Sequence, residues 1–182
     1  DGKSYTKPLT VKLDPRVKVT PAELEGQLAT AQAAAAKIKE LTPEVAKAAA
    51  VEKQWRDLAA KAKDNAALAS ALAAFGRRLT AVLGPPATNY GAPVIPLDTD
   101  HTSLRHLLAD YNTILAAVES ADAAPTAEQH SALRQDDDTF AATMTEWKQL
   151  LGDLPALNTR LQQAGLPEIT NQSQALGSRI HE

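Results

Sequence analysis

The chain has 182 residues and a formal net charge of −3, and 44% of its residues are hydrophobic but only 4% aromatic. This length is sufficient for one domain with a sizeable core. The alanine-rich composition favours closely packed helices over a β-sandwich, because sheets prefer β-branched and aromatic side chains. The 19 lysine and arginine residues are scattered, so we expect neither nucleic acid nor a membrane as a partner. The absence of cysteine excludes disulfides and thiolate metal sites.

Residues 1–18 have a pattern that differs from the rest of the chain. Apolar side chains at Tyr5, Leu9, Val11 and Leu13 alternate with polar ones, which is the period of a strand with one buried face. A single strand cannot satisfy its backbone groups alone. We therefore interpret residues 1–18 as an orphan strand and linker. Its pairing partner is expected upstream in a longer chain or in a neighbouring molecule, so self-association through this strand is also a candidate.

The helical period begins at Thr20, where Thr20, Pro21 and Glu23 form the sequence pattern of a capping box. The apolar stripe that follows consists of Leu24, Leu28, Ala31, Ala35, Ile38 and Leu41. Pro43 leaves two alternatives open: it separates two helices, or it kinks one helix of about 40 residues. A further stripe, from Leu68 to Val82, is ended by Gly84 and two prolines.

Residues 84–100 form the one long loop that we expect, and they are rich in proline. Such a loop in a compact domain is typically functional, mobile or a crossover. Two more helical patterns follow, the second of them capped by Thr126 with Gln129. Asp153 is expected to cap a last short helix that ends at Gly165.

Together these elements predict an all-α fold: an antiparallel helical bundle of four to six helices, preceded by a short N-terminal β-strand. The bundle is expected to span residues 19–167, and residues 168–182 are expected to form a polar tail.

The acidic and histidine residues do not form a recognisable catalytic or metal site. The run Asp136–Asp138 cannot converge on one ion, because neighbours on a helix project about 100° apart. Asp137 lies at the edge of an apolar stripe, and we expect it to pair with an arginine such as Arg77, Arg78 or Arg105. An enzyme that depends on Asp137 is a minor alternative.

The histidines are not spaced like a helical zinc pair, since His101 and His106 lie five residues apart. We expect His106 with Asp110, and His130 with Arg134, to be surface pairs. A metal site built from Asp98, Asp100 and His101 is a remote alternative. The Gly2-Lys3-Ser4 triplet lacks the earlier glycine of a phosphate-binding loop. We expect no cofactor, no catalytic residue and no metal ligand.

Three aromatic residues, Trp55, Phe140 and Trp147, fall on helical apolar stripes, so core packing is the favoured role for them. Tyr90, in contrast, lies in the long loop next to Asn89. Tyr90 and Asn89 are therefore the candidate ligand-contact residues.

Residues 1–17 resemble a segment of a family of large bacterial secreted proteins, the sortilin-like or BNR-repeat β-propellers, which are loosely called glycosyl hydrolases. Later stretches share the resemblance: residues 120–126, Trp147, residues 153–158 and residues 164–167. It implies that the first segment is the closing strand of a β-sandwich module and that a helical region follows. It also implies a periplasmic or extracellular location and upstream domains of the parent chain as partners, while any hydrolase chemistry would belong to the propeller.

The function expected from these observations is that of a non-catalytic accessory helical bundle, which packs against, spaces or docks its parent protein. The alternative is a carbohydrate- or peptide-binding module that uses the loop at residues 84–100.

Overall fold

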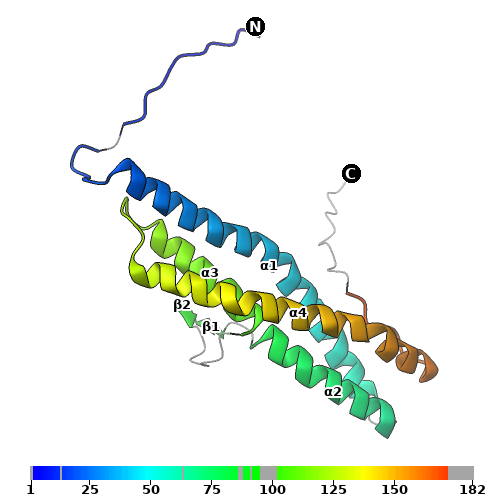
Figure 1. Ribbon diagram of the computed structural model, residues 1–182. Coiled ribbons are helices and arrows are strands. Elements are labelled where there is room, and N and C mark those ends of the chain that lie inside the picture. Colours follow the sequence, from blue (N-terminus) through cyan, green and yellow to red (C-terminus); the bar gives the residue numbers. More distant parts are fainter. Residues whose placement is uncertain are drawn as a thin grey trace.

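In the computed structural model, the described residues are 2–12, 14–62, 64–85, 88–90, 92–94 and 102–171, and for 88–90 and 92–94 only the backbone is described. This part of the chain contains four helices and one antiparallel hairpin of two short strands (Figure 1). The elements are α1 (Pro21–Lys61), α2 (Ala66–Leu83), β1 (Thr88–Tyr90), β2 (Ala92–Val94), α3 (Leu104–Val118) and α4 (Ala127–Gln163). The prediction of an all-α bundle is confirmed.

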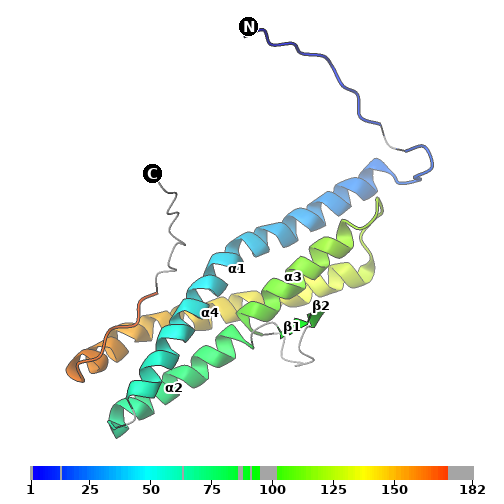
Figure 2. The same ribbon diagram turned by 180° about the vertical axis from the view of Figure 1, so that it is seen from behind.

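The four helices form three long tracks. Helices α1 and α4 run the length of the bundle, whereas α2 and α3 follow one another along the same side of α1 and together make the middle track (Figure 2). Both long helices pack closely on this middle track. At a rise of 1.5 Å per residue, the 41 residues of α1 extend roughly 60 Å. The molecule is therefore an elongated rod.

Helix α1 begins where the sequence predicts and continues through Pro43. The Thr20 hydroxyl accepts a hydrogen bond from the Glu23 N–H, and the Glu23 carboxylate accepts one from the Thr20 N–H at 2.7 Å. These two bonds complete the capping box. Of the two alternatives for Pro43, the structure shows the single helix. It bends near its middle without breaking (Figure 2).

Helix α4 corrects the prediction of a separate last helix that begins at Asp153. The helix runs from Ala127 to Gln163 without interruption, and Pro155 lies inside it. Leu150, Leu154 and Leu157 are all buried on both sides of this proline. Packing of these side chains in one continuous face outweighs the hydrogen bond that the proline removes from the helix.

The buried face of α4 follows a seven-residue repeat. Its core positions are spaced alternately by three and four residues, as in a coiled coil: Leu133, Asp136, Phe140, Thr143, Trp147, Leu150, Leu154, Leu157 and Leu161. The N-terminal part of this face, from Leu133 to Thr143, contains the two polar core positions, Asp136 and Thr143. From Leu150 onward, each of these core positions is leucine. We call the corresponding ends of the bundle its polar half and its apolar half.

The aromatic side chains confirm the predicted core. Trp147 is completely buried, Phe140 is nearly so, and Trp55 is half-buried against the core. For two residues of the predicted α1 stripe, burial was predicted wrongly. Leu28 is 57% exposed, and Ala35 is exposed whereas its neighbour Ala34 is buried. The stripe drifts because the 3.6-residue turn does not keep a fixed spacing of four residues in phase.

Helix α2 is unusually apolar for a helix of its length. By length and composition, this 18-residue helix, with a mean hydropathy of 1.3, is apolar enough to cross a membrane. Its apolar side chains are nevertheless used in the core: Leu68, Leu72, Phe75, Leu79, Val82 and Leu83 are buried. We interpret α2 as a core helix on this ground.

The two ends of the chain depart from the predicted domain limits in different ways. Residues 2–12 form neither helix nor strand and are exposed along their whole length. The predicted strand finds no pairing partner among the described residues, so it stays a prediction. At the other end the packing extends beyond residue 167, because Ile169 is only 2% exposed and belongs to the core. Residues 172–182 lie outside the described part.

Candidate functional site

The middle track is interrupted between α2 and α3, and the long predicted loop leaves the bundle there. Gly84 ends α2 with a φ of 79° and a ψ of 170°, a backbone conformation that is essentially restricted to glycine. A Cβ atom on Gly84 would lie 2.1 Å from the Ser103 hydroxyl oxygen. Ser103 in turn caps α3 by accepting a hydrogen bond from the His106 N–H. The end of α2 thus touches the start of α3.

Arg105 fastens this junction to the neighbouring long helix. Its guanidinium group donates a hydrogen bond of 2.6 Å to the carbonyl oxygen of Gly84 and one of 3.1 Å to the Glu52 carboxylate on α1. Both side chains of this ion pair are mostly buried, with exposed fractions of 20% and 12%. The Gly84 carbonyl belongs to the last turn of α2, where a cation is favourable.

A second contact fixes the returning end of the loop to the third track. The Thr143 hydroxyl on α4 donates a hydrogen bond of 2.7 Å to the carbonyl oxygen of Thr102. Both ends of the segment at residues 85–102 are therefore held by the bundle, and we call this segment the excursion. The hairpin β1–β2 lies within the excursion and beside the junction (Figure 2).

The candidate ligand residues Tyr90 and Asn89 lie on strand β1 of this hairpin. Their backbones pair with β2, Tyr90 opposite Ala92 and Asn89 opposite Pro93. Their side chains are outside the described residues, so their role as contacts stays a prediction. The same holds for the remote metal alternative at Asp98, Asp100 and His101, which also lies outside them.

A surface pocket of about 420 Å³ lies beside Thr102, where the excursion rejoins the bundle. It lies between the C-terminal part of α2 and the middle of α4. Its lining combines threonines, small apolar residues and three charged side chains: Arg78, Ala81, Val82, Thr102, Asp138, Thr139, Ala142, Thr143 and Glu146. The pocket therefore offers hydrogen-bond donors and acceptors of both charges to a small polar ligand.

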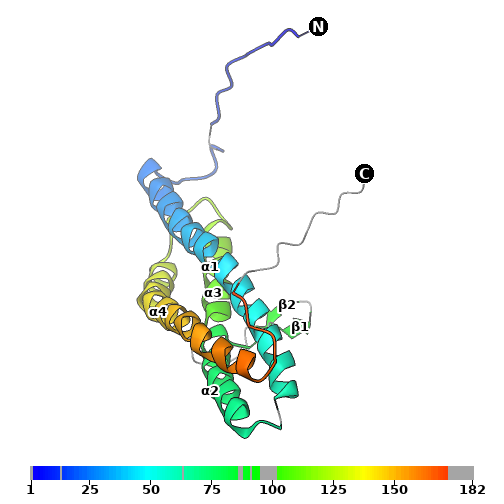
Figure 3. The same cartoon turned by 90° about the vertical axis from the view of Figure 1, so that its right-hand side faces the viewer.

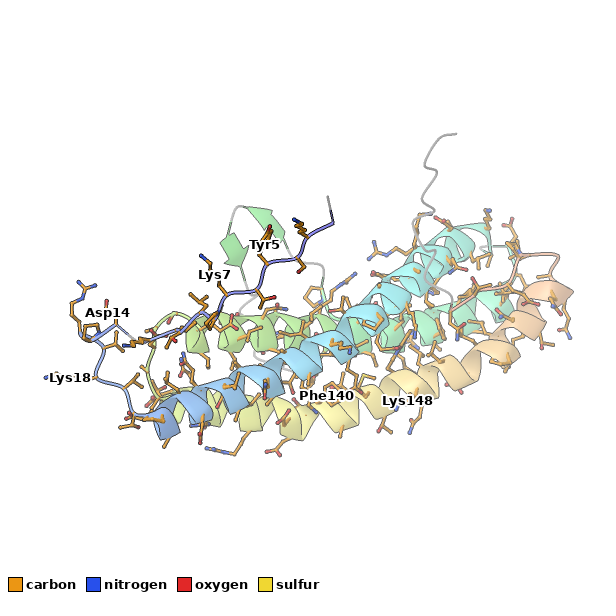
Figure 4. The ribbon with its side chains drawn as sticks, turned by 90° about the horizontal axis from the view of Figure 1, so that it is seen from above. Tyr5, Lys7, Asp14, Lys18, Phe140 and Lys148 are labelled. Atoms are coloured by element: carbon orange, nitrogen blue, oxygen red, sulfur yellow. The ribbon has the colours of Figure 1, made fainter. Side chains whose placement is uncertain are left out.

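A hydrogen-bonded network joins the three tracks in the polar half of the bundle. The Tyr111 hydroxyl on α3 donates a hydrogen bond of 2.8 Å to the Asp137 carboxylate on α4. Lys37 of α1 lies 3.6 Å from the same carboxylate, and its ammonium group is 3.8 Å from the centre of the Phe140 ring. Figure 4 shows Phe140 where α4 borders α1. The predicted arginine partner of Asp137 was wrong.

The network is suited to holding the tracks together. Burial, the hydrogen bond to Asp137 and the nearby carboxylates of Asp136 and Asp110 all raise the pKa of the Tyr111 hydroxyl. A raised pKa keeps this hydroxyl protonated, so that it acts as a donor and not as a base or nucleophile. The ring of Tyr111 also meets Phe140 edge-on, with centroids 6.4 Å apart.

Two further polar side chains occupy the core of this half, and neither was predicted to be buried. The predicted pair of His106 with Asp110 is present, with the His106 Nε2 3.4 Å from the Asp110 carboxylate, but His106 is only 8% exposed, so the expected surface location was wrong. Asp136 is 4% exposed, and it is the buried member of the acidic run in place of Asp137. Among the described residues, no group of three or more His, Asp or Glu side chains could hold a metal ion.

No family model, curated protein or solved structure matches this chain. The resemblance to secreted propeller proteins therefore depends on the residues of this chain alone.

Asp136 and Arg105 were both named from the sequence, but their roles in the buried core and at the junction were not predicted. The seven-residue spacing from Leu133 through Phe140 to Trp147 could have identified Asp136, since it places residue 136 three positions after a core residue. The role of Arg105 had no sequence signal, because it depends on the end of α2 meeting the start of α3. The Gly2-Lys3-Ser4 triplet is exposed and precedes no helix directly.

Proposed function

We propose that this chain is a non-catalytic accessory bundle that spaces or docks the parts of a larger secreted or envelope protein of the β-propeller class. The observation that carries this proposal is the exposed apolar face of the N-terminal segment. Tyr5, Leu9 and Val11 are 84%, 88% and 87% exposed. Three large apolar side chains on one face of an extended segment are what a strand needs to join a sheet in another module.

Pro8 determines which edge of this strand can pair with a neighbouring strand. In an extended strand, the N–H and C=O groups of successive residues point alternately to opposite edges. Pro8 has no N–H, and it shares its edge with Thr6 and Thr10. The other edge, which carries Tyr5, Lys7, Leu9 and Val11, has all of its donors. The segment is therefore suited to the outermost position of a sheet, with one neighbouring strand.

The connection between this segment and the rod is short and ordered by local hydrogen bonds. The Asp14 carboxylate accepts a hydrogen bond from the Arg16 N–H at 2.9 Å and pairs with its guanidinium group. The capping box at Thr20 then starts α1 at a defined residue. In Figures 1 and 3 the segment leaves the bundle at the start of α1 and projects away from it. A strand seated in a neighbouring module would therefore set where the rod begins.

A pair of substitutions on opposite faces of the segment tests this proposal. In the parent protein, Leu9→Asp places a charge on the apolar face and is expected to weaken the attachment of the bundle to the upstream module. Thr10→Asp places the same charge on the opposite face and is the matched control. Attachment is measured by limited proteolysis between the two parts. If Leu9→Asp and Thr10→Asp resist cleavage equally, the segment is not the docking strand.

Self-association through the same segment is the expected behaviour of the chain by itself. An unpaired strand edge pairs with a second copy when no other partner is present. Light scattering of the full chain is expected to show a concentration-dependent dimer that the Leu9→Asp variant does not form. A full chain that stays monomeric at all concentrations would remove this part of the proposal.

The second candidate function is a ligand-binding module that uses the excursion. The 420 Å³ pocket where it rejoins the bundle, with Arg78, Asp138 and Glu146 in its lining, is the observation that favours it. Saturable binding to a glycan or peptide array, weakened by Tyr90→Ala and by Glu146→Ala, is the expected result. An array without signal for the unaltered chain would exclude it.

A further inference from the structure

The segment that follows α4 turns back and lies between the C-terminal halves of the two long helices (Figure 3). Gly165, with a φ of 70°, ends the helix, and the Leu166 N–H donates to the carbonyl oxygen of Leu161 at 2.9 Å. Together with the bond from the Gly165 N–H to the carbonyl oxygen of Gln162, this forms the Schellman motif that commonly ends helices. We call residues 166–171 the docked segment and the space that it fills the α1–α4 groove.

Two side-chain amides hold the backbone of the docked segment from opposite sides. Asn158 on α4 accepts a hydrogen bond of 2.9 Å from the Ile169 N–H and donates one of 3.0 Å to the Ile169 carbonyl. Gln54 on α1 does the same for Thr170, with both distances at 2.9 Å. Each amide thus satisfies the donor and the acceptor of one residue, as a neighbouring strand would.

The groove also has a place for one aliphatic side chain. Ile169 is 2% exposed and belongs to the core, and Leu166 packs against it half-buried. The backbone bonds do not depend on which side chains the segment carries, whereas the Ile169 position selects an apolar residue. Backbone bonds for affinity and one side-chain position for selectivity are the features of extended-peptide recognition.

A pocket lies between α4 and the docked segment itself. It has a volume of about 280 Å³, and Leu151, Leu154 and Pro155 of α4 line it together with residues 169–171. Pro155 has no N–H, so the carbonyl oxygen of Leu151 has no donor four residues later in its own helix. A bound segment therefore has room for larger side chains beside these residues, next to a helix carbonyl that lacks its usual donor.

We infer that the α1–α4 groove is a binding site for an extended peptide segment of a partner, with an aliphatic side chain at the position of Ile169. The docked segment is its intramolecular occupant. Because the turn at Gly165 tethers it, its effective concentration at the groove is high. A partner segment binds after the occupant has left. This site is separate from the N-terminal segment, and it does not depend on the function proposed above.

A variant of the full chain that releases the occupant tests the inference. Ile169→Asp places a charge at the buried position and is expected to free the groove. A labelled synthetic peptide with the sequence of residues 165–171 is the probe, and fluorescence anisotropy measures its binding. The Ile169→Asp chain is expected to bind this peptide at least tenfold more tightly than the unaltered chain does. The same peptide with Asp in place of the isoleucine is expected not to bind.

Two double variants test the role of the amides. Adding Gln54→Ala to Ile169→Asp is expected to weaken peptide binding about tenfold, since two backbone hydrogen bonds are lost. Adding Asn112→Ala is the matched control, because the Asn112 side chain is exposed and donates within its own helix. Equal affinities for these two double variants would contradict the inference.

Hydrogen exchange of the unaltered chain keeps the test independent of any variant. The amide protons of Ile169 and Thr170 are expected to exchange at least tenfold more slowly than in a free peptide of the same sequence. If both amides exchange at the rate of the free peptide, the segment does not occupy the groove. The inference is then overturned, whatever the Ile169→Asp variant does.

Discussion

At the scale of single residues, the packing between α1 and α2 depends on one glycine. The Trp55 ring of α1 lies on Gly76 of α2, and its indole N–H donates a hydrogen bond of 2.8 Å to the carbonyl oxygen of Leu72. A Cβ atom on Gly76 would come within 1.9 Å of the ring. The hydrogen bond keeps the ring from moving away, so the close approach of these helices requires glycine.

Gly76→Ala is therefore expected to lower the free energy of unfolding by about 1–3 kcal/mol, the usual range for overpacking. Gly152→Ala is the matched control, since Gly152 lies exposed in α4 with nothing within 4 Å of the added atom. There the higher helix propensity of alanine is expected to raise stability by up to about 1 kcal/mol. Urea unfolding of both variants measures the difference. Equal effects of the two substitutions would contradict the described contact.

Through Glu44, the free energy of unfolding is expected to depend on pH. Its carboxylate accepts a hydrogen bond of 2.9 Å from the buried Trp147 indole N–H and pairs with Lys47. Burial is the largest single influence and raises the pKa of Glu44. The hydrogen bonds from Lys47 and Trp147 and the nearby lysine charges together lower the pKa by more than burial raises it, so the pKa lies below its ordinary value. A lowered pKa in the folded state adds stability above the unfolded pKa, and this stability is lost as the pH falls through the folded pKa.

The Glu44→Gln variant keeps an acceptor for Trp147 but carries no charge. The unaltered chain is expected to lose more stability than this variant between pH 6 and about pH 3, and unfolding curves across that range measure the loss. Parallel curves for the two proteins would show that Glu44 does not contribute in this way.

At the scale of elements, the caps were predictable and the continuity of the helices was not. Thr20 and Thr126 both form the capping boxes that their sequences predict. Caps depend on residues three positions apart, so local sequence specifies them. Pro155, in contrast, lies inside a helix, because the buried leucines on both sides of it continue one face. That balance between a lost hydrogen bond and retained packing depends on the neighbouring helices.

Pro43→Ala distinguishes the two alternatives for α1. In one continuous helix, alanine restores a backbone donor and removes a steric clash, so the free energy of unfolding is expected to rise by about 1–3 kcal/mol. At the first position of a separate helix, proline is favourable, and its removal would leave stability unchanged or lower it. Thermal and urea unfolding of the variant measure the sign of the change.

The polar core positions show why the site was only partly predictable. Asp137 was predicted at the border of the apolar stripe, and it does bond to another track through Tyr111. The identity of its partners depends on how α1, α3 and α4 are aligned along the rod, which no local pattern contains. The amides of Gln54 and Asn158 were not predictable for the same reason, since they meet the docked segment from two different helices.

At the scale of the whole molecule, the three-track rod explains the placement of the candidate sites. The excursion leaves the bundle at the junction in the middle track, and the N-terminal segment leaves at the start of α1 (Figure 1). The docked segment lies toward the other end of the rod, between the C-terminal halves of α1 and α4. The all-α bundle was predictable from composition and period. The alignment of α2 with α3 was not, because two short helices with a long loop between them also fit a side-by-side arrangement.

The central claim is that α1 is one continuous helix that fixes the length of the rod. Spin labels at Glu25→Cys and Lys61→Cys test it, since both positions are exposed near the ends of α1 and the chain has no other cysteine. Pulsed electron resonance is expected to give one narrow distance distribution near roughly 50–55 Å, the length of the intervening helix at 1.5 Å per residue. A broad distribution, or a clearly shorter distance, would show a hinge at Pro43 and contradict the account.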